Sequence, residues 1–154
     1  MKEADKNKIA EIMENHGVIV GYLFGSVMRG TMGPRSDIDV AVFFDNTQIP
    51  ETEQFKETLA LSADIAQAFS VENVDVINLN SQTNPVLRYE AVVNGEAIFV
   101  KDPSVKTQLA RAILREYENT RYLRETSYRI LREQIKSGLF GRAPVKSQSY
   151  VSTQ

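Results

Sequence analysis

The sequence contains no cysteine and a single histidine, His16. Without cysteine the chain forms no disulfide, has no thiol nucleophile and binds no metal through thiolates. One histidine argues against a His-rich zinc site, and a Ser-His-Asp triad would have to use His16. No hydrophobic run approaches the ~20 residues that a membrane helix needs, and the polar N-terminus is unlike the apolar core of a signal peptide. We therefore expect a cytoplasmic protein without a membrane partner.

The chain has 154 residues, of which 42% are hydrophobic and 25% are charged, which suits one globular domain with a single core. The net charge of −2 argues against a nucleic-acid-binding protein, because such proteins are usually basic. The charge is uneven: residues 1–100 contain 7 Lys and Arg against 15 Asp and Glu, whereas residues 101–154 contain 11 against 5. The two parts are expected to face different partners, unless the basic part is only a solvated helix face.

Hydrophobic periodicity predicts helices that alternate with four strands, an order typical of a single α/β (α+β) domain. We expect this domain to cover residues 1–137 and the polar tail 138–154 to be disordered. The last helix, 103–137, exceeds the usual globular length, which suggests that part of it docks on something. The expected strands are 18–24, 37–44, 74–79 and 97–100, and the expected helices are 2–16, a short one opening at Ser26, 51–70, Asn84–Asn94 and 103–137.

Two of these elements have a face that the sequence defines. In strand 37–44 the side chains alternate between an apolar face and a face that carries two acids. The apolar face has Ile38, Val40, Val42 and Phe44, and the other face has Asp37, Asp39, Ala41 and Phe43. In the helix that starts at Asn84-Pro85, the residues expected inside are Val86, Leu87, Ala91 and Val92.

The acidic face of strand 37–44 is the most informative feature of the sequence. Asp37 and Asp39 point the same way about 6.6 Å apart, and Asp75 lies in the next predicted strand. Carboxylates held on one face repel each other and are costly to bury without a counter-charge. Two Mg²⁺ ions fit between such carboxylates, because Mg²⁺ prefers oxygen ligands and substrate phosphates. The alternative is that Asp37 and Asp39 only face solvent and that Asp75 forms a local cap.

A glycine–serine pair supplies a second half of the predicted site. Gly25-Ser26 follows strand 18–24, where glycine lets the backbone approach a phosphate and the next helical turn offers free N–H groups. Arg29 and Arg35 follow closely and carry charge that suits a triphosphate. These parts predict a nucleoside-triphosphate site with in-line transfer over two metals, whereas the simpler interpretation makes Gly25 only a turn.

At these residues the sequence resembles a known family. Gly25-Ser26, ten residues, Asp37-x-Asp39 and the later Asp75 resemble the nucleotidyltransferase motif of the DNA polymerase beta superfamily, over about residues 15–100. The small size resembles the minimal nucleotidyltransferases, which are the antitoxins of HEPN–MNT toxin–antitoxin pairs. The resemblance implies a polymerase-beta-like fold with a mixed sheet, and transfer of AMP from ATP, with two Mg²⁺ ions, to a tyrosine of a partner HEPN ribonuclease in a hetero-oligomer.

The resemblance also implies a role for each matching residue. Asp37 and Asp39 would bind the metals, and Asp75 would complete the metal nearer the acceptor and favour deprotonation of its hydroxyl. Gly25 and Ser26 would hold the β- and γ-phosphates. The remaining predicted phosphate contact is Arg29.

Two alternative functions stay open. One is nucleotidyl transfer to a small-molecule hydroxyl of the aminoglycoside type, and the other is a non-catalytic antitoxin that blocks its toxin by binding. The long basic helix 103–137, in which Tyr117, Tyr122 and Tyr128 lie among arginines, is not explained by the resemblance, and we interpret it as a solvated or protein-docking face. Arg88 and Tyr89 are interpreted as a surface pair, or as contacts to a nucleotide or acceptor.

Overall fold

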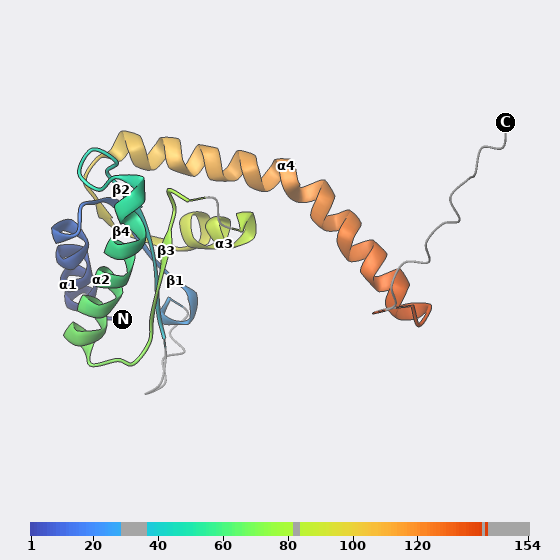
Figure 1. Ribbon diagram of the computed structural model, residues 1–154, viewed down its shortest axis with the longest axis horizontal. Coiled ribbons are helices and arrows are strands. Elements are labelled where there is room, and N and C mark those ends of the chain that lie inside the picture. Colours follow the sequence, from blue (N-terminus) through green and yellow to red (C-terminus); the bar gives the residue numbers. More distant parts are fainter. Residues whose placement is uncertain (29–36, 82–83, 140, 142–154) are drawn as a thin grey trace. The chain divides into compact units, whose positions relative to one another are not determined.

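The structure is a computed structural model, and the description covers residues 1–28, 37–81, 84–139 and 141 (Figure 1). Arg29, Arg35 and most of the predicted tail lie outside these residues. The chain forms two compact units, Met1–Asn119 and Thr120–Gln154, and each is described by itself.

The first unit is built on a four-stranded sheet with the order β3-β2-β1-β4. The strands are β1 Val18–Phe24, β2 Ile38–Phe44, β3 Val74–Asn78 and β4 Glu96–Val100. Strand β1 is antiparallel to both β2 and β4, whereas β2 and β3 run parallel. The sheet is therefore mixed, and the predicted α+β class is confirmed.

Helices connect the strands and pack on both faces of this sheet. The parallel pair β2 and β3 is joined by α2, because parallel neighbours need a crossover connection. The short helix expected at Ser26 is one 3-10 turn, and the helix expected from Asn84 changes from α-helix to π-helix along its length. The helical elements are α1 Glu3–Asn15, η1 Gly25–Val27, α2 Glu51–Phe69, α3 Pro85–Tyr89, η2 Glu90–Asn94 and α4 Pro103–Lys136.

One face of the sheet is closed by α1 and α2, which lie side by side (Figure 1). Helix α1 packs close to β1 at Gly21, where a Cβ would lie only 2.2 Å from Met13 Sδ. The predicted apolar face of β2 is at most 1% exposed on this side of the sheet. Its members are Ile38, Val40, Val42 and Phe44, packed with Ile9, Met13, Leu61 and Ile65.

A polar contact ties α1 to α2 at the edge of this core. The His16 ring lies 2.5 Å from Glu57 Oε1 and 2.7 Å from Asp64 Oδ2, both on α2. Its two nitrogens are thus occupied by side chains of the neighbouring helix. The histidine therefore has a structural role at the contact between the two helices.

The opposite face of the sheet is covered over only part of its length. Ala41 and Leu79 pack there with η2 and with Leu109 and Ile113 of α4. Arg88 donates to Glu116 at 2.9 Å and to the Leu79 carbonyl at 3.2 Å, and the Tyr89 and Tyr117 rings stack at 4.0 Å. The interpretation of Arg88 and Tyr89 as a surface pair is therefore wrong, because both hold the first half of α4 against the domain.

The second unit contains the C-terminal half of α4. Its large hydrophobic side chains are exposed, namely Tyr122, Leu123, Tyr128, Ile130, Ile135 and Leu139. Arg121 and Glu125 form an exposed ion pair one helical turn apart, at 2.9 Å. Among the residues described, no helix combines the length and hydrophobicity needed to cross a membrane.

Candidate active site

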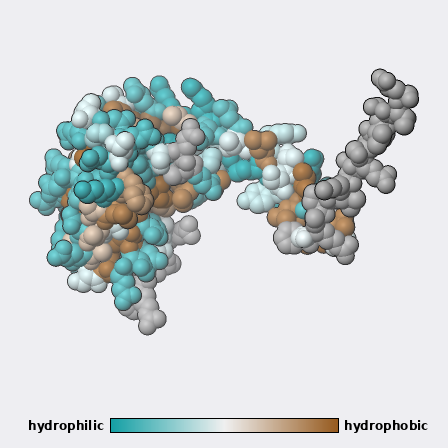
Figure 2. All heavy atoms as spheres, in the orientation of Figure 1, coloured by the Kyte–Doolittle hydropathy of each residue, from teal (hydrophilic) through white to brown (hydrophobic). Residues whose placement is uncertain are grey.

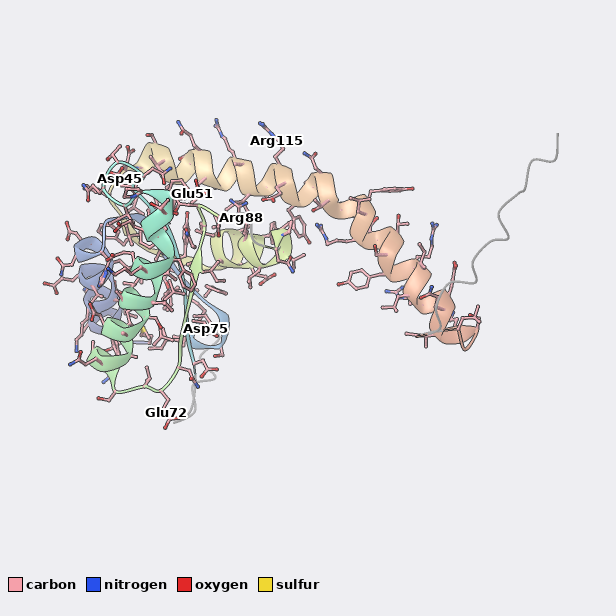
Figure 3. All side chains as sticks on the ribbon, viewed as in Figure 1. Asp45, Glu51, Glu72, Asp75, Arg88 and Arg115 are labelled. Atoms are coloured by element: carbon pink, nitrogen blue, oxygen red, sulfur yellow. The ribbon has the colours of Figure 1, made fainter. Side chains whose placement is uncertain are left out.

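Three neighbouring strands bring Phe24, Asp39 and Asp75 together in one row. Phe24 of β1 pairs with Asp39 of β2, and Asp39 pairs with Asp75 of β3. Neighbouring strands lie about 4.8 Å apart and paired residues point to the same face, so the two carboxylates are adjacent. Figure 3 shows Asp75 on β3, which is the edge strand. The sheet therefore presents two acids side by side on its less covered face.

These acids open into a cleft of about 470 Å³. Helices η2 and α4 cover this face of β2 only around Ala41 and Phe43, which leaves the Asp39 end accessible. Apart from the two carboxylates the wall is apolar. The residues that line the cleft are Phe24, Asp39, Asp75, Val76, Ile77 and Leu87.

Asp37 lies directly before β2 and is exposed. Partial burial raises the pKa of the Asp39 carboxyl, and the negative charges of Asp75 and Asp37 raise this pKa further. All three predicted acids are therefore close enough to interact, and the ionised form of Asp39 is disfavoured by its surroundings.

These acids do not form a ready-made metal cage. Among the described residues no group of three or more His, Asp or Glu side chains is gathered closely enough to hold a metal ion. Like charges favour side-chain positions that keep the oxygens apart. The donor set nevertheless suits Mg²⁺, because it consists only of carboxylate oxygens around a partly buried acid that a cation would stabilise.

Gly25 fits closely against Asp39. It has a φ of +78°, and a Cβ at this position would lie 2.2 Å from Asp39 Oδ2. Glycine tolerates this left-handed backbone and leaves room for the carboxylate, whereas any other residue would be strained and would displace the acid. The turn η1 thus places its backbone directly beside the acidic row.

The other two predicted phosphate contacts are less fully described. Ser26 is half-buried in η1, adjacent to Gly25. Arg29 lies outside the described residues, as does Arg35. A single 3-10 turn has no extended helix dipole, so any anion held here would be bound by local N–H and hydroxyl groups.

The apolar lining of the cleft was not predicted. The sequence predicts Leu87 on the buried face of its helix, but the side chain is 40% exposed and lines the cleft. Helix α3 is only five residues long, so its faces cannot be assigned from periodicity. The sequence did contain one indication that α3 borders the acids, because the Asn84-Pro85 helix start places α3 as the next element after β3, which carries Asp75.

Comparison with known families decides the classification. A family model described as "Polymerase beta, Nucleotidyltransferase" matches residues 7–104. The chain belongs to this family. The matched segment includes η1, β2 and β3, so this nucleotidyltransferase carries Gly25, Asp39 and Asp75 within the family's own domain.

Solved structures resemble this nucleotidyltransferase across most of its length. A crystal structure of a toxin–antitoxin with AMP-PNP has a TM-score of 0.68 and 24% identity, and the match covers 82% of this chain and 97% of that chain. A mutant of the toxin–antitoxin MntA-HpeT gives a TM-score of 0.65 at 21% identity, with the same shares covered. At such identity the likeness shows the fold. No curated protein sequence matches the chain.

Proposed function

We propose that this nucleotidyltransferase transfers AMP from ATP to a tyrosine hydroxyl of a cognate HEPN ribonuclease toxin, and so acts as its antitoxin. The observation that carries the proposal is the row of Asp39 and Asp75 across β2 and β3, with Asp37 nearby and Gly25 against Asp39. The similar structures support a toxin partner and a nucleotide, because they are a toxin–antitoxin with AMP-PNP and mutants of MntA-HpeT.

Asp37, Asp39 and Asp75 are the residues that would hold two Mg²⁺ ions. When bound, the ions neutralise charge on the phosphates and on the attacking oxygen. The backbone at Gly25 and the Ser26 hydroxyl would hold the β- and γ-phosphates, and Arg29 would contact phosphate. The chain thereby orients the α-phosphorus toward the acceptor, which is the main contribution that positioning makes to phosphoryl-type transfer.

Asp75 has the exposure that an acceptor-side residue needs. It lies on the edge strand and is exposed, whereas Asp39 is half-buried behind it. In the proposed step, the tyrosine oxygen forms a bond to the α-phosphorus and the hydroxyl proton passes to the Asp75 carboxylate. The bond between the α-phosphorus and its bridging oxygen breaks, and pyrophosphate leaves with the electron pair.

The proposal is tested by following the α-phosphate. ATP labelled at that position is incubated with Mg²⁺, the HEPN partner and either the native chain, Asp75→Asn or Glu11→Gln. We expect label on a partner tyrosine with the native chain and Glu11→Gln, and none with Asp75→Asn. Glu11 is the control because it is an exposed acid on α1, away from the row.

Two outcomes would replace the proposal with its alternatives. If Asp75→Asn neutralises the toxin as well as the native chain does, the antitoxin acts by binding alone. If label passes only to an aminoglycoside or another small hydroxyl compound, the acceptor is a small molecule.

A further inference from the structure

The edge strand β3 has backbone groups that face away from the sheet. Leu79 N–H donates to the Val42 carbonyl and the Asn73 carbonyl accepts from Ile38 N–H, so odd-numbered residues of β3 face β2. Because alternate residues of a strand direct their N–H and C=O groups to opposite sides, Val74, Val76 and Asn78 face the free edge.

The two end carbonyls of this edge already accept hydrogen bonds from side chains. The Val74 carbonyl accepts a hydrogen bond from the Ser62 hydroxyl at 2.7 Å, and the Asn78 carbonyl accepts one from the Ser81 hydroxyl at 2.9 Å. Within the described part of the chain, neither the N–H nor the C=O of Val76 has a partner. Side chains therefore cap the two end carbonyls of the edge, and Val76 between them presents both a donor and an acceptor.

Val76 also lies where two clefts meet. On one face of the sheet is the cleft that contains Asp39 and Asp75, and on the other is a cleft of about 360 Å³ between α2 and β3. Val76 lines both of them. The second cleft is lined by Glu51, Gln54, Phe55, Thr58, Val76, Asn78, Asn80 and Ser81.

Hydrophobic surface borders the edge on both sides. Phe55 is 75% exposed and Leu59 57% exposed on α2, and Leu87 is 40% exposed on α3. Figure 2 shows brown, hydrophobic surface in the region of α2 and β3. A free strand edge with a side-chain cleft on each face is the arrangement that binds an extended peptide as an added strand.

We infer that the acceptor protein docks as an extended segment paired with the edge of β3 at Val76, and that its modified tyrosine lies opposite Asp75. This inference rests on the proposed function and specifies how the acceptor is recognised. The guest residue opposite Val76 points into the α2 cleft, and its neighbours point to the face of Asp75 and Ile77.

The same geometry selects tyrosine over serine. Strands are spaced about 4.8 Å apart, so a guest strand lies one spacing from Asp75 and two spacings from Asp39. A short serine side chain ends near Asp75, whereas a tyrosine ring extends over β3 and brings its hydroxyl between the two acids. The apolar wall formed by Phe24, Ile77 and Leu87 suits the faces of that ring.

Charge at the two ends of the edge defines the guest further. Glu72 precedes β3 and Glu51 lines the α2 cleft beyond its other end (Figure 3). No lysine or arginine is among the described residues that line either cleft. The preferred segment is therefore an aromatic and apolar sequence flanked by Lys or Arg.

The test uses a blocked peptide, Lys-Val-Tyr-Val-Lys, with the full-length chain, AMP-PNP and Mg²⁺. Residue-resolved amide exchange is followed as the peptide is raised to millimolar concentration. We expect exchange at Val76 to slow by about tenfold or more, while Asp75 and Ile77, which already bond to β2, change little. Two further peptides are N-methylated at successive residues, and only the one methylated at the amide that faces β3 should lose binding.

A pair of variants repeats the test on the protein. Val76→Pro removes the outward N–H and Val76→Ala keeps it, so transfer of label from ATP to the peptide should fall about tenfold further in Val76→Pro. An unchanged Val76 amide at millimolar peptide, or equal binding of both methylated peptides, overturns the inference. Label on Tyr150 of the chain itself, lost in Tyr150→Phe, would make the chain's own tail the occupant and also overturn it.

The same data separate this inference from the proposed function. Protection of Val76 without any labelled peptide or partner would support the docking edge and contradict the transfer reaction. A HEPN partner that is labelled equally by Val76→Pro and Val76→Ala would support the reaction and contradict the docking edge.

Discussion

The two faces of β2 differ in what their side chains do, although they alternate residue by residue. Ile38 and Val40 are at most 1% exposed in the core under α1 and α2. Asp39, between these two residues, and Asp37, before them, face the open side, where their negative charges repel each other. One face therefore stabilises the strand, and this lets the other carry an arrangement of charges that would not stabilise it.

The same division extends to β3 but weakens at the edge of the sheet. Val74 belongs to the closed core, whereas Asp75 is exposed beside it. The acidic face thus becomes more accessible from β1 to β3, while the core face stays covered by α2. If this comparison holds, substitutions on the two faces have separable effects on transfer and on stability.

The largest expected effect comes from the acidic face. Asp39→Asn should lower transfer by roughly a thousandfold, because one of the carboxylates that would hold the Mg²⁺ ions is lost. The fold should remain, since Asn has the same shape as Asp and removes a negative charge that Asp37 and Asp75 repel. Label transfer and circular dichroism measure the two effects, and a variant that keeps more than a tenth of the transfer would contradict the comparison.

Gly25→Ala should lower both the stability of the fold and the rate of transfer. The added Cβ meets Asp39 Oδ2 and the backbone φ is +78°, so we expect a loss of about 1–3 kcal/mol in the free energy of unfolding. Displacement of Asp39 should also reduce transfer by about a hundredfold. Urea unfolding and labelling of the same sample check this, with Gly138→Ala as the control, because a Cβ there meets nothing within 4 Å. Equal results for the two variants would contradict the close fit at Gly25.

Val40→Ala tests the apolar face. The side chain is fully buried next to Asp39 in sequence, and its truncation should cost about 2 kcal/mol in the free energy of unfolding. Transfer per folded molecule should change by less than about twofold, because Val40 lies on the face of the sheet opposite to Asp39 and Asp75. A large drop in transfer at full folding would show that the two faces are not separable.

Much of this comparison could be predicted from the sequence, because it depends on local patterns. The alternation of Ile38 and Asp39 fixes which side chains share a face, and Gly25-Ser26 after an apolar strand predicts the turn. The pairing of Asp39 with Asp75 could not be derived from spacing alone, since it depends on a parallel contact across the whole of α2. Strand alternation, with Asp75 in the next predicted strand, predicts that the acids share a metal site, and the resemblance to a family implies the role of each.

The parts that sequence reasoning missed depend on long-range packing. Arg88 and Tyr89 are on a five-residue helix, and their partial burial depends on Leu79 and on Glu116 and Tyr117 of α4. Leu87, on the same helix, faces the cleft instead of the core. Short helices give too few turns for a hydrophobic face to be assigned, so tertiary contacts decide which side is buried.

The smallest expected effect is a pH dependence of stability that only the acidic face produces. The pKa of Asp39 is raised above its ordinary value of 3.8 in the folded protein, so the unfolded chain releases this proton first as pH rises. The protonated Asp39 therefore contributes its full stability to the folded protein below pH 3.8, and this contribution is lost as the pH rises through the folded pKa. Asp39→Asn has no such proton, so its stability does not change in this way. In EDTA, Asp39→Asn should therefore match the native chain in acid and exceed its Tm by a few degrees at neutral pH.

Saturating Mg²⁺ should remove or reverse this advantage, because a ligand that binds only the folded native protein stabilises it. Urea and thermal unfolding across pH measure both effects, and a variant less stable than the native chain at neutral pH in EDTA would show that the charge of Asp39 is compensated after all.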